Sequence, residues 1–594
     1  MILIQPGFLF RFILPSLLCT LFLVSCGTEQ HVELRPAEGG KFYGGIYRMN
    51  ETDAIKTLDP VGLNDAPSHH VVHQIADQLV DFDSSLTLQP ELAENWEISE
   101  DQLTYTYHLR KGVLFHDNAC FPNGKGREMK ASDVKFCFDR ILDARSGTKG
   151  ADYFRDKVVG AQAFFDATAN NDRKVPEGGV PGFKAVDDYT FQIQLLRPFP
   201  AFKYYPALGM TYIYPPEAVE KYGQDFFRNI VATGPFVLKS WEADRELILE
   251  RNPNYWRKDE HGNQLPFLDS IQFTFKKEQA TMLTEFTKGN LEENYRIPPE
   301  FVETIFEKRE IGSTAPWKLT GNYTKFTLHV IPSIATNYYG MLTLDPIFQD
   351  KRIRQAFNYA IDRERIIAFV LKGQAAGPAN HGLVPPAMPN YPAEMVKGYN
   401  FDVAKAKALM AEAGYPDGKG FPAITLQLNS GGGLNEKVAE TIQDQLKKNL
   451  GIEVEMKQVQ FAQHLDMIDK GEAAFFRLAW IADYPEPENF LNLLWGKNAA
   501  PKGKISPINS TRYNNPEFDA LFEQAMKTPD DTERYRLYAQ AEQIAVDDAP
   551  MLWIYHSLDF RLVQPYVRGY SSNPMDRRDL VGVWFDYNNT EGGS

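Results

Sequence analysis

Cysteine, basic charge and long apolar runs are all scarce in this chain. Four cysteines occur among 594 residues, which argues against a metal site built from thiols. Lys and Arg number 63 against 78 Asp and Glu, so the net charge is −15. Because phosphate binding needs a concentrated basic surface, nucleic acid is excluded as a partner. No apolar run of about 20 residues follows the N-terminal segment, so the chain is not a polytopic membrane protein.

Common catalytic signatures are also missing. The chain has no Gly-x-Ser-x-Gly nucleophile turn, no Gly-x-x-x-x-Gly-Lys-Ser/Thr phosphate loop and no His-Glu-x-x-His zinc helix. It also lacks an internal repeat of 20–50 residues, which excludes solenoids and propellers. Nothing in these patterns requires an enzyme, although a chain of this size can carry an active site without such a signature, and no cofactor is predicted.

The length and the aromatic content are what the chain does have. At ~100–200 residues per domain, 594 residues predict three or four domain-sized units. Aromatic residues make up 13% of the chain, which fits large packed interfaces or an aromatic-lined cleft.

The N-terminus has the pattern of an export signal. Residues 1–25 are almost wholly apolar, carry Arg11 as their only charge and end in Leu-Val-Ser before Cys26. This end resembles a bacterial lipobox. In that resemblance the chain would be cleaved between Ser25 and Cys26, and Cys26 would carry the lipids. Residues 26–40 would then form a polar tether. Lipid chains anchor a protein without spanning the membrane. The alternative is a single-span anchor with an incidental cysteine.

Two cysteines, Cys120 and Cys137, lie in the body that would remain after cleavage. An exported compartment is oxidising, so we predict that they can pair as a disulfide. Two unreactive thiols are the alternative, and no metal site is expected.

Periodicity predicts a mixed α/β protein. Residues 103–109 and 189–195 alternate as half-buried strands, and residues 143–186 between them are polar and rich in Gly and Pro, which predicts a surface excursion. An amphipathic helix is predicted from Lys351, capped by Asp350, with the helical pattern ending at Gly373. Strand 424–428, helix 434–450 and strand 452–456 predict a parallel βαβ unit.

Two weaker patterns were weighed as possible ligand sites. His69 and His73 are four residues apart, as in some metal sites, but no nearby carboxylate or cysteine completes a set of ligands. A polar helix face is the better interpretation. The glycines at 431–433 open a helix and could bind an anion, although a flexible turn is the simpler interpretation.

The stretch 475–491 carries the clearest functional pattern. An apolar strand contains Arg477 and runs into Asp483, which is followed by a turn rich in proline. In an extended strand these two charges would point to the same face, roughly 20 Å apart. They could be opposite anchors along one groove, or incidental charges on a core strand; spacing alone leaves both open.

This stretch resembles the motif of the oligopeptide-binding proteins of ABC transporters, the family 5 extracellular solute-binding proteins. The resemblance rests on several motifs in order along the chain. They are Leu58-Asp59-Pro60, residues 90–96 (Pro-Glu-Leu-Ala-Glu-Asn-Trp), residues 109–117 with 131–134, residues 233–236, residues 252–256, residues 352–356, residues 360–362 and Trp480-Ile481-Ala482-Asp483-Tyr484-x-Glu486-Pro487-x-x-Phe490-Leu491. A longer stretch at 118–130, with Cys120, departs from the family pattern.

The resemblance implies an α/β fold of the type II periplasmic binding-protein class, with three lobes and a hinged ligand cleft. Lobe I would be discontinuous (41–67, 200–330 and 556–594), lobe II would cover 68–199, and lobe III would cover 331–555. Ligand would lie between lobes I and III and be enclosed when the hinge closes.

The resemblance also implies roles for individual residues. Asp483 would hold the α-amino group of a peptide, Arg477 would bind the carboxylate of shorter peptides, and Trp480, Ala482 and Tyr484 would line the ligand site. The implied function is a monomeric, lipid-anchored periplasmic or cell-envelope receptor that delivers oligopeptides to an ABC permease and its ATPase subunits. The alternatives are the same fold with a non-peptide solute (a nickel complex, haem or an oligosaccharide) and a secreted hydrolase.

Overall fold

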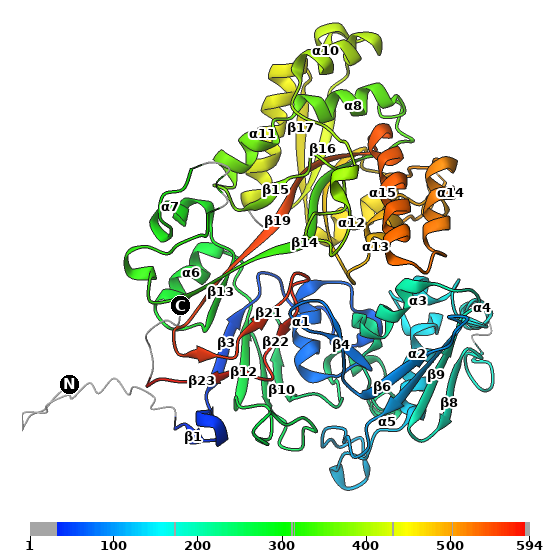
Figure 1. The fold of residues 1–594 in the computed structure, drawn as a ribbon, viewed down its shortest axis with the longest axis vertical. Coiled ribbons are helices and arrows are strands. Elements are labelled where there is room, and N and C mark those ends of the chain that lie inside the picture. The colour runs from blue at the N-terminus through cyan, green and yellow to red at the C-terminus, as the bar shows by residue number, and fades with distance from the viewer. Residues whose placement is uncertain are drawn as a thin grey trace, which may run out of the picture.

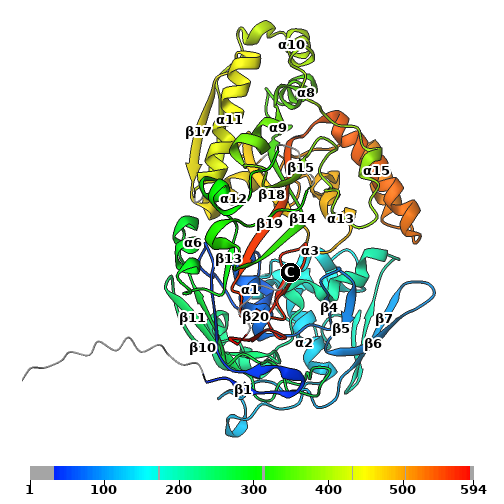
Figure 2. The ribbon, with the colours of Figure 1, turned by 60° about the vertical axis from the view of Figure 1, so that its left-hand side comes forward.

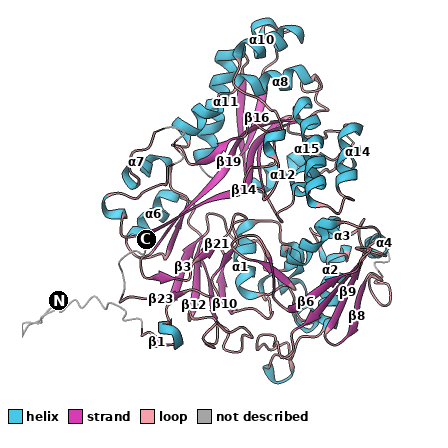
Figure 3. Cartoon of the chain, in the orientation of Figure 1, coloured by secondary structure: helices cyan, strands magenta, loops and turns pink. Residues whose placement is uncertain are grey.

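A computed structural model describes residues 33–170, 174–310, 313, 315–430, 433–501 and 503–588. The predicted signal segment 1–25 and Cys26 lie outside these residues. The chain forms an upper body and a lower body (Figure 1). The lower body contains two four-stranded sheets, and the upper body contains most of a seven-stranded sheet with helices on its flanks, as Figure 3 shows by colour.

The first sheet of the lower body combines segments that are far apart in the sequence. Its strands, in spatial order, are β10 (Phe236–Glu242), β11 (Glu246–Arg251), β12 (Ser270–Thr274) and β3 (Ile46–Asn50). The first three strands pair antiparallel, whereas β12 and β3 pair parallel. Helix α1 (Ala66–Ile75) and the C-terminal strands β21 (Ser571–Ser572), β22 (Arg578–Asp579) and β23 (Trp584–Phe585) lie near this sheet in Figure 1, and β20 (Val567–Arg568) pairs with β23. This part of the fold is therefore built from both ends of the chain and its middle.

The second sheet of the lower body is a continuous antiparallel unit. Its order is β6 (Ala93–Ile98), β7 (Thr104–Leu109), β9 (Thr190–Gln194) and β8 (Phe183–Asp187). Strands β7 and β9 confirm the two strands that alternation predicted, because the residues of each strand alternate between buried and half-buried. Helices of this unit are α2 (Ala131–Ile141), α3 (Ala151–Phe154) and α4 (Ala161–Ala169).

Residues 143–186 are not the polar surface excursion that their composition predicted. They include α3, α4 and β8, and the rings of Phe154, Phe164 and Phe183 are buried in the core. Buried aromatic rings are thus present in a segment whose average composition is polar, which a composition average does not reveal.

The predicted disulfide does not form. Cys120 and Cys137 are both free thiols. Cys137 is fully buried on α2, where its thiol hydrogen-bonds with the backbone of Tyr214 (3.2 Å to the carbonyl oxygen). Burial raises the pKa of the Cys137 thiol, so the reactive thiolate is disfavoured there.

The large sheet forms the centre of the upper body. Its main order is β13 (Glu293–Tyr295), β19 (Met551–Val563), β14 (Thr327–Met341), β18 (Phe475–Ile481), β16 (Ile424–Asn429) and β17 (Val454–Val459), and β15 (Ala375–Pro378) pairs with β19. Flanking helices are α8 (Lys351–Ala360), α10 (Val403–Glu412), α11 (Gly433–Leu450), α12 (Phe461–Asp469), α13 (Pro487–Leu491), α14 (Pro516–Ala525) and α15 (Asp531–Asp548). Strands β16 and β17 pair parallel around α11, which confirms the predicted βαβ unit.

The helix predicted from Lys351 begins as expected but ends early. Asp350 caps it by accepting a hydrogen bond from the backbone N–H of Arg352. The helix stops at Ala360 because Asp362 caps a new short helix, α9 (Arg363–Arg365), which continues as a π-turn to Val370. An apolar pattern continues across such a break, so periodicity alone did not show it.

Two long antiparallel strands connect the bodies. β14 and β19 run from the lower left into the upper body in Figure 1, and the same arrangement is visible after the 60° turn of Figure 2. Their pairing shifts register between Pro332 and Thr336. A bulge bends a strand locally.

Helices and sheets alternate in a mixed α/β architecture, as the sequence predicted. Within the described ranges, no helix is both long enough and apolar enough to cross a membrane.

Candidate functional site

Asp483 lies where a central strand of the upper body ends. β18 is paired with β14 on one side and β16 on the other, and its last residue is Ile481. Asp483 follows two residues later, and the chain then turns into α13 at Pro487. The acid therefore projects from a position fixed by a buried sheet.

Asn489 of α13 holds the end of this strand. Its side-chain oxygen accepts hydrogen bonds from the indole N–H of Trp480 (2.8 Å) and the backbone N–H of Asp483 (3.1 Å). Its side-chain nitrogen donates to the Asp483 carboxylate at Oδ2 (3.2 Å). A single buried amide thus contacts two residues of the predicted site.

Tyr153, from the lower body, reaches the same carboxylate. Its hydroxyl donates to Oδ2 of Asp483 at 2.7 Å, although the two residues are 330 positions apart. Tyr153 lies on α3, in the segment that composition predicted to be a surface excursion. The contact places Asp483 where the two bodies meet.

Tyr484 and Ala482 are buried beside Asp483. The Tyr484 hydroxyl donates to Glu488, and its ring lies near the rings of Tyr204 (6.2 Å between centroids) and Tyr205 (5.5 Å). Tyr484 therefore packs between the bodies, and a direct contact between Tyr484 or Ala482 and a ligand stays a prediction.

Arg477 lies on the other face of β18 from Trp480, since the two residues are three positions apart in a regular strand. Its guanidinium donates to the side-chain oxygen of Asn337 on β14 at 2.7 Å. Asp483 lies beyond the strand, where alternation no longer determines the direction of a side chain. The structure thus gives the two predicted anchors different partners.

Burial dominates the electrostatics of Asp483. Burial raises the pKa of its carboxyl group above the usual value of 3.8, although the hydrogen bonds from Tyr153 and Asn489 and the charge of Arg577 oppose the shift. No cation lies within ion-pair distance of Asp483 among the described residues. A cation placed beside this carboxyl group would favour its ionised form and lower its pKa.

A polar cavity lies in the lower body near this site. Its volume is about 240 Å³, and its wall includes Phe82, Asp81 and Arg577. The Phe82 ring is 5.7 Å from the Tyr204 ring, which in turn faces Tyr484. Through these rings the cavity adjoins the place where the bodies meet.

The histidines of α1 that were considered as metal ligands contact aromatic neighbours. His69 and His73 stack at 6.1 Å between ring centroids, and the Tyr212 hydroxyl is 3.0 Å from Nδ1 of His73. No group of three or more potential metal ligands gathers in the part of the chain that the structure describes. Of the three glycines considered as an anion site, Gly431 and Gly432 lie outside the described residues.

Comparison with known proteins places the chain in a family. A sequence model of the bacterial extracellular solute-binding proteins, family 5 (middle region), matches residues 87–502, more than two thirds of the chain. The chain belongs to this family.

Relatives and solved structures agree with this assignment. The chain is 28% identical over 535 residues to the periplasmic oligopeptide-binding protein OppA of Escherichia coli K12, covering 89% of this chain and 90% of that protein. It is 30% identical over 524 residues to heme-binding protein A of Haemophilus influenzae, covering 86% and 87%. The structure of DppA from Helicobacter pylori in complex with the peptide STSA is similar with a TM-score of 0.74 and 26% identity, covering 91% and 98%.

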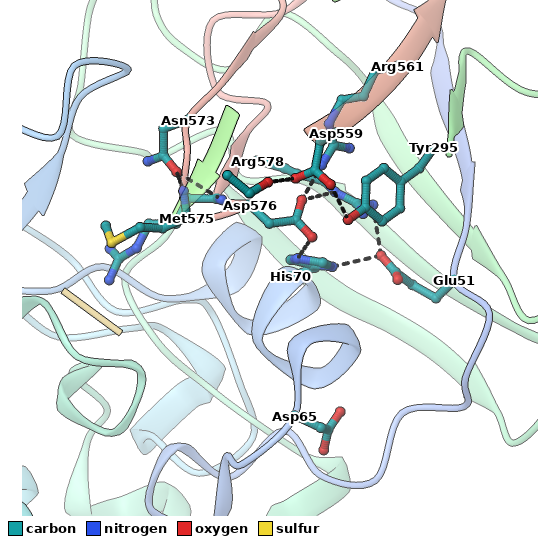
Figure 4. Close-up of polar contacts among 12 residues, drawn as sticks. Glu51, Asp65, His70, Tyr295, Asp559, Arg561, Asn573, Met575, Asp576 and Arg578 are labelled. Atoms are coloured by element: carbon teal, nitrogen blue, oxygen red, sulfur yellow. Dashed lines mark hydrogen bonds and ion pairs between the residues drawn. The ribbon is translucent and has the colours of Figure 1, made fainter. Parts of the chain in front are cut away.

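A second group of buried charges in this family 5 protein surrounds His70 and Arg578 (Figure 4). We call it the buried charge cluster; it consists of Glu51, His70, Glu293, Arg561, Asp576 and Arg578. Arg578 lies 2.8 Å from Glu51 and 3.2 Å from Glu293, and Arg561 pairs with Asp576. The cluster ties the C-terminal segment to α1, β13 and β19.

The histidine of this cluster is held as a cation. His70 Nδ1 is 2.9 Å from Glu51, and Nε2 is 3.4 Å from Asp576. Burial and the nearby Arg578 lower the pKa of His70, but the two carboxylates outweigh them and raise it to about 9. The cluster leaves no local pattern in the sequence, because its members are separated by up to 527 positions.

Proposed function

We propose that this family 5 protein is the substrate-binding component of an ABC importer and that it binds oligopeptides between its two bodies. The observation that carries the proposal is the half-buried carboxylate of Asp483, which lies where the bodies meet and has no cationic partner among the described residues. The names of the OppA relative and of the peptide-bound DppA structure support the same class of ligand.

The division into three lobes is part of this proposal, and the two sheets of the lower body support it. Strands β3, β10, β11 and β12 fall within the ranges proposed for lobe I, and β6 to β9 fall within the range proposed for lobe II. The proposed borders of lobe III at 330/331 and 555/556 cut β14 and β19. We assign the hinge to these two strands, because they cross between the bodies and their register shifts there.

Asp483 would bind the α-amino group of the peptide. An ammonium group bound to a fixed carboxylate forms a charge-assisted hydrogen bond, which is short and directional. Trp480, Ala482 and Tyr484 would form the surroundings of the first peptide residues. Backbone groups at the edge of a sheet can pair with an extended peptide, so binding would depend little on side chains.

Arg477 would bind the carboxylate of shorter peptides. Its guanidinium donates to Asn337 through one Nη atom, which leaves further N–H groups for a second acceptor. Arg477 and Asp483 are six positions apart, and a fully extended chain of that length spans roughly 20 Å, the length of about six peptide residues.

The protein would act outside the cytoplasmic membrane and perform no chemistry. We propose cleavage before Cys26, lipidation of that residue and transfer of cargo to a permease whose ATPase subunits supply the energy. The lipobox-like sequence supports the anchor, and the periplasmic OppA relative supports the location. Replacing Cys26 with alanine should release the protein from membrane fractions into the soluble fraction.

Binding is tested by incubating the purified protein with a mixture of tri- to pentapeptides. Retained peptides should be recovered intact and should raise the melting temperature, because saturation at 100 times Kd adds about 2.7 kcal/mol to stability. Cleaved peptides would instead indicate a hydrolase. Mass spectrometry of the molecules that co-purify with the protein identifies its ligand. Recovery of haem or another non-peptide solute without peptides would reject the proposed ligand.

A further inference from the structure

We propose that Asn489 is a positioning residue that makes the site selective for a free amino group. This inference rests on the proposed function of Asp483. Asn489 is 3% exposed, so its amide is held by packing and does not itself reach a ligand in the cleft.

The hydrogen bonds around Asp483 are unequal between its two oxygens. Oδ2 accepts from both Tyr153 and Asn489. Oδ1 has no partner among the described residues, and it does not belong to the buried polar atoms that are sealed from solvent. One oxygen is therefore held by the protein and the other remains available to a ligand.

Asn489 is the residue that makes this arrangement rigid. It binds Asp483 at two points, the backbone N–H and the carboxylate, so both the position of the main chain and the rotation of the side chain are restricted. Tyr153 alone would hold one oxygen from the opposite body, and that contact changes whenever the bodies separate. Asn489 lies six residues from Asp483 in the same body and keeps its contacts through opening.

The same amide also connects Asp483 to Trp480. The Asn489 side-chain oxygen accepts hydrogen bonds from both the indole N–H of Trp480 and the backbone N–H of Asp483. The Trp480 ring and the Asp483 carboxylate are therefore held at a fixed relative position. A site in which the charged anchor and an aromatic wall are preorganised together loses less entropy on binding.

The experiment uses the full chain and a mixture of tetrapeptides, half of them N-acetylated, and measures the ratio of free to acetylated peptide retained. In Asn489→Ala this ratio should fall about ten-fold, since a freely rotating carboxylate discriminates less. Asn489→Asp keeps acceptors for both N–H groups but places a second carboxylate against Asp483, and its ratio should differ from that of Asn489→Ala.

Asn492→Ala is the matched control. Asn492 lies just after α13, and its side-chain oxygen accepts from Asn498 at 2.7 Å, without a contact to Trp480 or Asp483. Its ratio should equal that of the unmodified protein. A purely structural role of Asn489 would weaken both classes of peptide equally and leave the ratio unchanged, which overturns the inference.

Asp483→Asn separates this inference from the proposed function. If Asp483→Asn removes the preference for free amines while Asn489→Ala leaves it intact, the proposed function stands and the positioning role is wrong. If Asp483→Asn leaves the preference intact, or if the unmodified protein shows none, the amine-anchor role fails and the role of Asn489 fails with it.

Discussion

Two buried groups of charges in this protein have opposite electrostatic balance. In the buried charge cluster every carboxylate faces a guanidinium or an imidazolium, and Arg561 and Arg578 also lie over the ring of Tyr295 (4.3 and 5.0 Å). Where the two bodies meet, the hydrogen-bond donors to the Asp483 carboxylate among the described residues are both neutral, Tyr153 and Asn489.

The direction of the pKa shifts expresses this difference. Burial raises the pKa of both Asp576 and Asp483, but Arg561, Arg578 and His70 reverse the effect for Asp576 and hold its pKa well below 3.8. For Asp483 the effect of burial prevails. A charge that the fold has already neutralised stabilises the structure, whereas a charge left without a counter-ion is a place for a ligand to supply one.

The largest effect should follow from breaking the buried charge cluster. Arg578→Met leaves Glu51 and Glu293 buried without their closest cation, and such a loss destabilises by about 3–5 kcal/mol. Urea unfolding measures it. Arg245→Met, an exposed residue, is the control and should change stability by less than about 1 kcal/mol. Equal effects of the two variants would contradict the comparison.

The pH dependence of stability should show the contribution of protonated His70. Its pKa is raised from 6.5 to about 9 by folding, so its contribution is fully present below pH 6.5 and is lost as the pH rises through about 9. We expect a loss of about 2–3 kcal/mol over this interval. Melting curves between pH 6 and 10 should show the decline, and in His70→Gln the decline should be absent.

Asp483→Asn should reduce peptide affinity without reducing stability, whereas a substitution in the buried charge cluster should reduce stability. Affinity for peptides with a free amine should fall about 10- to 100-fold, because the charge-assisted bond is lost. The melting temperature should stay the same or rise slightly, since a buried charge without a counter-ion is removed. Calorimetric titration and melting curves measure the two quantities, and a large loss of stability would show that Asp483 is structural.

The pH dependence of peptide binding should report the ionisation of Asp483. Only the ionised carboxylate attracts an ammonium group, so binding should weaken as the pH falls through the pKa of Asp483. Because that pKa is raised, the loss should begin at a higher pH than for an ordinary aspartate with a pKa of 3.8. N-acetylated peptides should show no such dependence in the same titration.

The smallest effect is expected for Arg477→Gln. Arg477 is half-buried and already has Asn337 as a partner, so the loss should be a few-fold and confined to peptides whose carboxylate reaches it. A series of peptides of increasing length tests this, with Lys437→Gln, an exposed residue on α11, as the control. Equal losses at every length would reject the assigned role.

Much of the architecture could be predicted from local sequence patterns. Alternation identified β7 and β9, and the order strand, helix, strand identified the parallel unit around α11. These predictions succeed because the periods of a strand and a helix depend on neighbouring residues. The break of the helix at Ala360 was missed, because a capping aspartate competes with an apolar pattern that continues.

The candidate site was predictable only in part. Asp483 stands out in sequence as an acid directly after an apolar strand. Its hydrogen-bond partner Tyr153 does not, since that residue lies in a segment of polar composition 330 positions away. The disulfide failed for the same reason: separation in sequence does not reveal that Cys137 is enclosed in a core.

The sequence by itself determined the family, the alternation of helices and strands and the position of one acid at the end of a strand. Only the tertiary structure decided which charges have a counter-ion inside the protein and which have none among the described residues. The reason is physical: a residue's periodicity depends on its neighbours in the chain, whereas its burial and its counter-ions depend on segments hundreds of residues away.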